Sequence, residues 1–116
     1  MNVMVMGKKE RSRRTPHSAA LTAASVLEIL RGELPRLRKE HNVRSIGLFG
    51  SYVKGSQGAK SDIDILVEYE ITPGMLRYLD LENDLSELLG CKVDLVLKDW
   101  LKPSIGSRIL QEVQNV

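Results

Sequence analysis

The sequence has a single cysteine, five aromatic residues and no long apolar run, and each shortage excludes a class of protein. Cys91 cannot form a disulfide within the chain, so a disulfide-stabilised domain is excluded and a reducing cytoplasm is expected. The aromatic side chains are too few for a binding surface built mainly from stacked rings. No uncharged run approaches the ~20 residues that cross a bilayer, and the first six residues are too short for a signal-peptide core. We therefore expect neither a secreted nor a membrane protein.

Length and charge predict one small domain preceded by a basic segment. The 116 residues suffice for one domain and leave no room for two. Residues 1–18 hold five basic residues against one acidic residue, whereas the rest of the chain holds 12 basic and 14 acidic residues. We expect residues 1–17 to be a flexible leader and residues 18–116 to be the domain. Because a solvated tail is the usual role of such a leader, direct nucleic-acid binding is expected only through it, if at all.

Two helix-start signals precede the first expected strand. Thr15-Pro16 is a capping residue followed by proline, and Ser25 begins a capping-box pattern that ends at Glu28. Leucines then recur at helical spacing and predict a buried face; they are Leu27, Leu30, Leu34 and Leu37. The helical region ends near His41-Asn42. Because Pro35 falls inside this pattern, we expect a kink or two consecutive helices.

The remaining pattern predicts an α/β (α+β) fold with one small mixed sheet. The expected strands are Arg44–Phe49, Asp62–Val67 and Lys92–Leu97, and the expected helices are Thr72–Gly90 and Pro103–Val113. The glycines and small polar residues of 50–61 indicate a turn-rich connection. A sheet of three strands or slightly more, with helices packed on it, is the economical arrangement of so few elements.

Three aspartates occupy positions that packing alone does not explain. Asp62 and Asp64 are two residues apart, so they project from one face of the second strand with Cα atoms about 6.6 Å apart. Unpaired carboxylates this close disfavour each other's ionisation, and a hard cation such as Mg²⁺ removes that penalty. Asp94 lies within the third strand, where acidic residues are unfavourable. If the second and third strands are neighbours, Asp94 completes a three-carboxylate cluster.

A glycine–serine pair ends the first strand. Gly50 permits close approach of a ligand to the backbone, and Ser51 offers a hydroxyl beside free N–H groups, which suits a phosphate. Phosphate donors beside a metal-binding cluster are what nucleotidyl transfer needs. Taken singly, these features are usually structural, and Asp94 could simply pair with Lys92 or Arg44. Their occurrence together, in this order, favours a functional site.

The same residues carry a family resemblance. Gly50-Ser51, ten residues and then Asp62-Ile63-Asp64 match the G-S-x10-D-x-D signature of the polymerase-β-like nucleotidyltransferase superfamily. Residues 46–55 and 61–67 closely resemble its minimal nucleotidyltransferase (MNT) group, and Val93–Val96 resembles the third-carboxylate strand of that group. The resemblance covers roughly residues 25–115 and implies the polymerase-β-like nucleotidyltransferase fold.

The resemblance also implies roles for particular residues. The three aspartates would hold Mg²⁺, expected as two ions, and Asp94 would be a ligand or a general base. The phosphates of ATP would be bound by Gly50, Ser51, Lys54 and Ser61. The group usually has arginine where this chain has Lys54, and lysine keeps the charge but lacks the planar fork that contacts a phosphate through two hydrogen bonds.

An activity and a partner follow from the resemblance. Minimal members are typically antitoxins encoded beside a helical HEPN ribonuclease toxin, and they resemble enzymes that transfer AMP from ATP to a tyrosine of that toxin. The small size of this domain agrees, because a folded partner must then present its own acceptor hydroxyl. The alternative is a non-catalytic antitoxin that neutralises its toxin by binding alone. A transferase acting on a small molecule is disfavoured because a second domain is missing.

Overall fold

The computed structural model describes residues 21–55 and 62–116. The elements in chain order are α2 (Ala23–His41), β1 (Val43–Phe49), α3 (Ser51–Lys54), β2 (Ile63–Tyr69), α4 (Met75–Leu89), β3 (Val93–Leu97), the 3₁₀ helix η2 (Lys98–Trp100), α5 (Pro103–Glu112) and β4 (Gln114–Asn115). The strands form one sheet in the order β3-β2-β1-β4. β2 and β3 are parallel, whereas β1 is antiparallel to both β2 and β4. The expected class, a small mixed α/β sheet, is confirmed.

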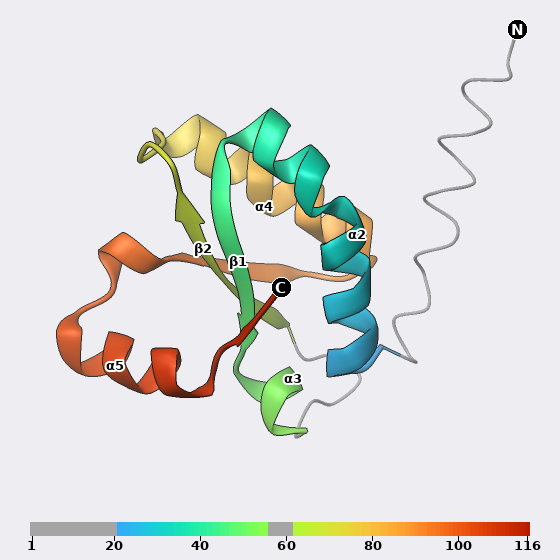
Figure 1. Cartoon of the computed structure of the whole chain (residues 1–116), viewed down its shortest axis with the longest axis vertical. Helices are drawn as coiled ribbons and strands as arrows, with labels where there is room; N and C mark the ends of the chain where they lie inside the picture. Colours follow the sequence, from blue (N-terminus) through green and yellow to red (C-terminus); the bar gives the residue numbers. More distant parts are fainter. Residues whose placement is uncertain (1–20, 56–61) are drawn as a thin grey trace, which may run out of the picture.

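One face of the sheet forms the core beneath α2 and α4, which pack against each other (Figure 1). The inward residues of β2 are fully buried, as are three leucines of α4; they are Ile63, Ile65, Val67, Leu81, Leu85 and Leu89. Burying one such side chain stabilises the fold by about 1.5–3 kcal/mol. α5 lies on the other side of the sheet (Figure 1). Stability therefore resides mainly in one face, and the opposite face is left for chemistry.

The first described helix is a single one that begins at Ala23. Thr22 is its N-cap: Ser25 N–H donates to Thr22 Oγ1 at 3.2 Å, and Thr22 N–H donates to Ser25 Oγ at 2.8 Å. The prediction that Ser25 starts the capping box was wrong, because Ser25 is the third helical residue of a box that Thr22 begins. Pro35 lies inside this one helix, so of the two predicted alternatives, a kink or two consecutive helices, the second was wrong and the first stays a prediction. The fully buried Leu30 and Leu37 pack on either side of the proline and hold both segments to the sheet. The other predicted start, at Thr15-Pro16, lies outside the described residues.

Strand and helix ends differ from the predicted bounds by a few residues. β2 begins at Ile63, so Asp62 lies just before the strand rather than in it. α4 begins at Met75 rather than Thr72 and ends at Leu89; Gly90 is its C-cap, with φ 74°, so the glycine that the pattern predicted does close the helix. Neither α3 nor η2 was predicted as a helix, because three or four residues carry no periodicity.

The C-terminal residues add a fourth strand that the sequence pattern does not indicate. β4 pairs with β1, and Val116 N–H donates to Ile46 O at 2.9 Å. A Cβ at Gly47 would lie 2.5 Å from Val113 Cγ2, so glycine is what lets the C-terminal segment approach β1. The predicted last helix consequently ends at Glu112, one residue early.

β3 forms one edge of the sheet, and side chains of α4 cover its outward backbone groups. Tyr78 donates from its hydroxyl to Leu95 O at 2.5 Å. Leu95 N–H donates to Glu82 Oε2 at 3.4 Å, and Val93 N–H donates to Ser86 Oγ at 3.2 Å. Residues four apart lie on one side of a helix, so one stripe of α4 binds outward backbone groups of Val93 and Leu95.

Candidate active site

The sheet register places two of the three predicted aspartates side by side. β2 and β3 are parallel, and Asp64 is paired with Asp94 in their ladder. On the other side of Asp64, β1 contributes Phe49. Residues paired in a ladder project their side chains from the same face, so Asp64 and Asp94 share the face opposite α2 and α4. The condition that the second and third strands be neighbours is met.

Asp62 lies next to this pair but is directed partly elsewhere. Its Oδ2 lies 3.9 Å from Lys92 Nζ, an ion pair in which the lysine side chain is 78% exposed. A pair this exposed contributes little free energy, so Asp62 can turn from Lys92 toward another cation at small cost.

Gly50 joins the end of β1 to this carboxylate pair. Its φ of 78° lies in the region that favours glycine, and a Cβ built on it would overlap the carboxylate of Asp64. Glycine is therefore required twice at this position, once by the backbone turn and once by the closeness of Asp64. α3 begins at the next residue, Ser51, so the predicted phosphate-binding pair lies directly beside the carboxylates.

The electrostatics of this arrangement favour a bound cation. The pKa of Asp64 is raised above its ordinary value, first because the group is partly buried and then because the charges of Asp94 and Asp62 are near. A hydrogen bond from the Ser51 backbone acts in the opposite direction and favours the ionised form. An ionised Asp64 is thus held against an electrostatic cost that a divalent cation would remove, and carboxylate oxygens are the ligands that Mg²⁺ prefers.

Glu112 is a site residue that sequence reasoning missed. Gly50 N–H donates to Glu112 Oε1 at 3.2 Å, and Lys54 Nζ lies 3.6 Å from Glu112 Oε2. A carboxylate from α5 therefore contacts two of the groups predicted to bind phosphate. One acidic residue at the end of a helix, far along the chain, gives no sequence signal for this contact. The fourth predicted phosphate ligand, Ser61, lies outside the described residues.

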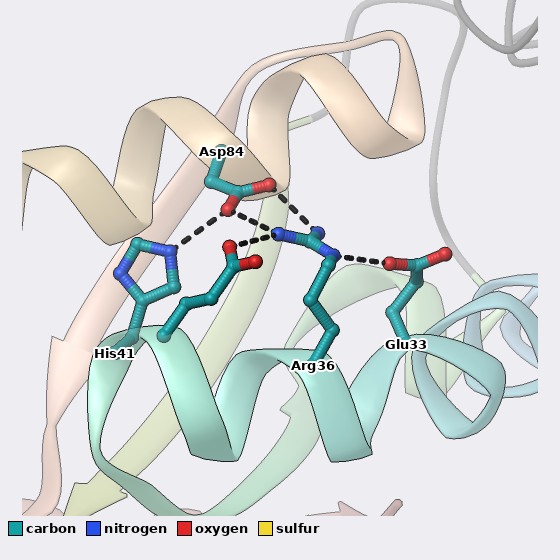
Figure 2. A network of polar contacts seen from close by, with 5 residues as sticks. Glu33, Arg36, His41 and Asp84 are labelled. Atoms are coloured by element: carbon teal, nitrogen blue, oxygen red, sulfur yellow. Dashed lines mark hydrogen bonds and ion pairs between the residues drawn. The ribbon is translucent and has the colours of Figure 1, made fainter. Parts of the chain in front are cut away.

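A second polar cluster joins α2 to α4 on the opposite side of the sheet (Figure 2). Arg36 donates to both oxygens of Asp84, at 2.8 and 3.0 Å, and also to Glu33 and Glu40. His41 Nε2 lies 2.8 Å from Asp84 Oδ2. Burial alone would raise the pKa of Asp84, but the hydrogen bonds from Arg36 and His41 outweigh it and the pKa is lowered.

The spacing of this cluster also meets a criterion for metal binding. Ligand atoms of Glu40, His41 and Asp84 all lie within 4.8 Å of one another, the one such group of three in the part of the chain that the structure describes. The oxygens of the three predicted aspartates are therefore spread more widely. However, Arg36 already supplies the positive charge among the acids of the α2–α4 cluster, so we interpret that cluster as an interhelical ion network and not as a metal centre.

Comparisons with known proteins agree with this geometry. Residues 27–116 match the family model described as nucleotidyltransferase domain. The chain belongs to the nucleotidyltransferase domain family. This nucleotidyltransferase is 45% identical over 98 residues to the protein adenylyltransferase MntA of Thermococcus cleftensis, and the match covers 84% of this chain and 99% of the relative. The family predicted from the glycine–serine and aspartate motifs is confirmed.

Solved structures extend the similarity to the fold. A minimal nucleotidyltransferase superposes with a TM-score of 0.71 at 28% identity, covering 84% of this chain and 99% of that one. A toxin–antitoxin crystallised with AMP-PNP superposes with a TM-score of 0.61 at 27% identity, covering 82% of this chain and 72% of that one. Of the helices described for this nucleotidyltransferase, none has the length and apolar composition to span a membrane.

Proposed function

We propose that this nucleotidyltransferase transfers AMP from ATP to a tyrosine hydroxyl of a partner HEPN ribonuclease toxin and thereby silences that toxin. The observation that carries the proposal is the pairing of Asp64 with Asp94 directly beside Gly50. Two relatives support it: the 45% identical protein is named a protein adenylyltransferase, and the 27% identical complex is a toxin–antitoxin with an ATP analogue.

Asp64 and Asp94, joined by Asp62, would hold Mg²⁺ in one or two positions. The fit rests on the donor set, which is all carboxylate, and on the raised pKa of Asp64, which follows first from partial burial and then from the nearby charges of Asp94 and Asp62. When bound, Mg²⁺ supplies charge neutralisation for the triphosphate.

The other residues of the site orient the nucleotide and move a proton. Gly50 N–H and the Ser51 hydroxyl would contact the triphosphate, and Lys54 would add a positive charge; Ser61 is proposed as a further phosphate ligand. The tyrosine oxygen bonds to the α-phosphorus, and the bond from that phosphorus to the pyrophosphate oxygen breaks. Asp94 is exposed on the edge strand, where a docked partner has access, and its carboxylate accepts the proton of the hydroxyl.

A second candidate is an antitoxin that only binds its toxin. The contact of Glu112 with Gly50 N–H and Lys54 favours it, because this carboxylate competes with a phosphate for the same two groups. The two candidates make opposite predictions for variants of the aspartates.

The test combines labelled ATP, Mg²⁺ and the purified candidate toxin. We expect label on the toxin, a toxin mass increased by whole AMP units, and loss of both with Asp64→Asn or Asp94→Asn while the complex still forms. Asp80→Asn, an exposed acid on α4, is the matched control and should transfer AMP normally. Full neutralisation of the toxin by the Asp64→Asn, Asp94→Asn double variant would establish the binding-only antitoxin instead.

A further inference from the structure

A hollow of about 280 Å³ lies on the same face of the sheet as the aspartates. Its floor is formed by Gly47 of β1 and Leu66 of β2, and its apolar wall by Leu110 and Val113 at the end of α5. Gly47 adds no side chain, so the floor is flat there. Binding sites for whole small molecules are usually ~300–1,000 Å³, so this hollow suits a single ring system rather than a complete nucleotide.

The register fixes where the hollow lies relative to the aspartates. Asp64, Leu66 and Glu68 follow one another on the same face of β2, so the Cα of Glu68 is about 13 Å from that of Asp64 along the strand. An extended nucleoside monophosphate approaches this length when it is measured from its phosphorus to the far edge of its base. A nucleotide with its phosphate at Asp64 can therefore reach the hollow with its base.

Charged groups meet at the far end of the hollow. Glu68 Oε1 accepts a hydrogen bond from Ser45 Oγ at 3.2 Å and lies 3.7 Å from Lys98 Nζ. The other oxygen of Glu68, Oε2, lies 3.7 Å from Arg44 Nη1. Glu68 and Lys98 both line the hollow, and both keep hydrogen-bonding capacity beyond these contacts, since a carboxylate has about four acceptor positions and an ammonium has three donors. An acceptor and a donor therefore lie side by side at one end of a hollow whose lining is partly polar and partly apolar.

We propose that this hollow binds the adenine base of ATP and that Glu68 and Lys98 select it. The proposal rests on the proposed function, which places the α-phosphate at Asp64. Adenine presents an exocyclic amino group, which donates to Glu68, next to a ring nitrogen, which accepts from Lys98. Guanine presents the reverse order, a carbonyl oxygen and then a ring N–H. In the same orientation its oxygen would face the acceptor Glu68, and its N–H would face the donor Lys98. Leu66, Leu110 and Val113 pack against the ring.

The first experiment measures, in the presence of Mg²⁺, the Kd of ATP and the Kd of GTP for the wild-type protein and for Glu68→Gln. The preference for ATP is the ratio of the two Kd values. A glutamine amide donates as well as accepts, so the preference for ATP should fall by about tenfold, the equivalent of one hydrogen bond of ordinary strength. Glu87→Gln is the matched control: Glu87 is an exposed acid on α4 that does not line the hollow, so the preference should stay as in the wild type. An unchanged preference in Glu68→Gln overturns the assignment of this residue.

The second experiment fills the hollow without disturbing the core. Leu110 is 47% exposed on the wall, and Leu110→Trp should weaken Mg²⁺–ATP binding to the free protein by tenfold or more in calorimetry. Ile105→Trp alters an equally exposed position of the same helix outside the hollow and should bind ATP normally. If Leu110→Trp binds ATP normally but raises the KM for the toxin, the hollow holds a segment of the partner and the adenine proposal is wrong. Because binding to the free protein needs no transfer, a wild type that binds ATP but never modifies toxin refutes only the proposed function.

Discussion

Replacing Asp64 by asparagine should stabilise the fold while removing the proposed activity. Asp64 and Asp94 are paired on strands about 4.8 Å apart, so their ionised forms repel by about 1 kcal/mol in water and more where solvent is partly excluded. Asparagine keeps the shape that fits against Gly50 and can still accept the Ser51 hydrogen bond. We therefore expect Asp64→Asn to raise the free energy of unfolding by about 1 kcal/mol, or the Tm by about 5 °C for a domain of this size.

The stability difference between the wild type and Asp64→Asn should depend on pH, and the raised pKa of Asp64 fixes the direction of the change. A carboxyl group whose pKa is higher in the folded than in the unfolded state costs stability once it is ionised. The stability of the wild type should therefore fall, relative to Asp64→Asn, as the pH rises from below about 4 through the raised pKa. At lower pH, Asp64 is protonated in both states and the advantage of the variant should vanish.

Urea unfolding with a chelator and with Mg²⁺ tests this reasoning. In chelator the variant should be the more stable protein at neutral pH. A ligand at 100 times its Kd adds about 2.7 kcal/mol, so saturating Mg²⁺ should stabilise the wild type and reverse the order. Asp80→Asn, remote from the pair, should follow the wild type in both conditions. A variant that is less stable than the wild type in chelator would show that Asp64 serves the fold and would refute the repulsion argument.

Three further predictions concern single residues. Gly50→Ala should lower the free energy of unfolding by about 2 kcal/mol or more, because φ is positive and the added methyl group overlaps Asp64. Gly55→Ala has a positive φ but open space around the methyl group, so it should lower the free energy of unfolding by only about 1 kcal/mol. Equal losses for the two variants in urea unfolding would contradict the overlap. Glu112→Gln should lower the Kd for ATP about fivefold by calorimetry, and an unchanged Kd would separate Glu112 from the phosphate groups. Asp84→Asn should cost about 1–2 kcal/mol at neutral pH. Because the pKa of Asp84 is lowered in the fold, that loss should shrink as acid protonates it, and a loss independent of pH would contradict the ion network.

The candidate site residues could be predicted from the sequence because their signals are local. A glycine before a serine, two aspartates two residues apart and an acid within an apolar strand each break the expected pattern within a few positions. Even so, the closeness of Asp64 to Asp94 depends on which strands are neighbours, and the sequence alone left that open. The structure supplies it through the parallel pairing of β2 with β3.

The parts that escaped prediction depend on contacts between distant segments. Glu112 contacts Gly50 through the last turn of α5, a helix that begins more than 50 residues after Gly50 in the chain. β4 has two residues, too few for any alternation, and its pairing with β1 relies on the missing side chain of Gly47. The start of α2 was predicted at the wrong residue for a different reason. Thr22 and Ser25 both have side chains that can cap a helix. Ser25, at the third helical position, accepts the hydrogen bond from Thr22 N–H that a glutamate at this position usually accepts.

The stripe of Tyr78, Glu82 and Ser86 along β3 determines how another protein can approach this one. An uncovered border strand would let a second polypeptide extend the sheet, which is a route to fibrous aggregation and to indiscriminate pairing. In this protein, side chains of α4 already bind outward backbone groups of Val93 and Leu95 in the edge strand β3. If the proposed function is correct, a partner that presents a hydroxyl to Asp94 is expected to recognise the side chains of this surface rather than to add a strand to β3.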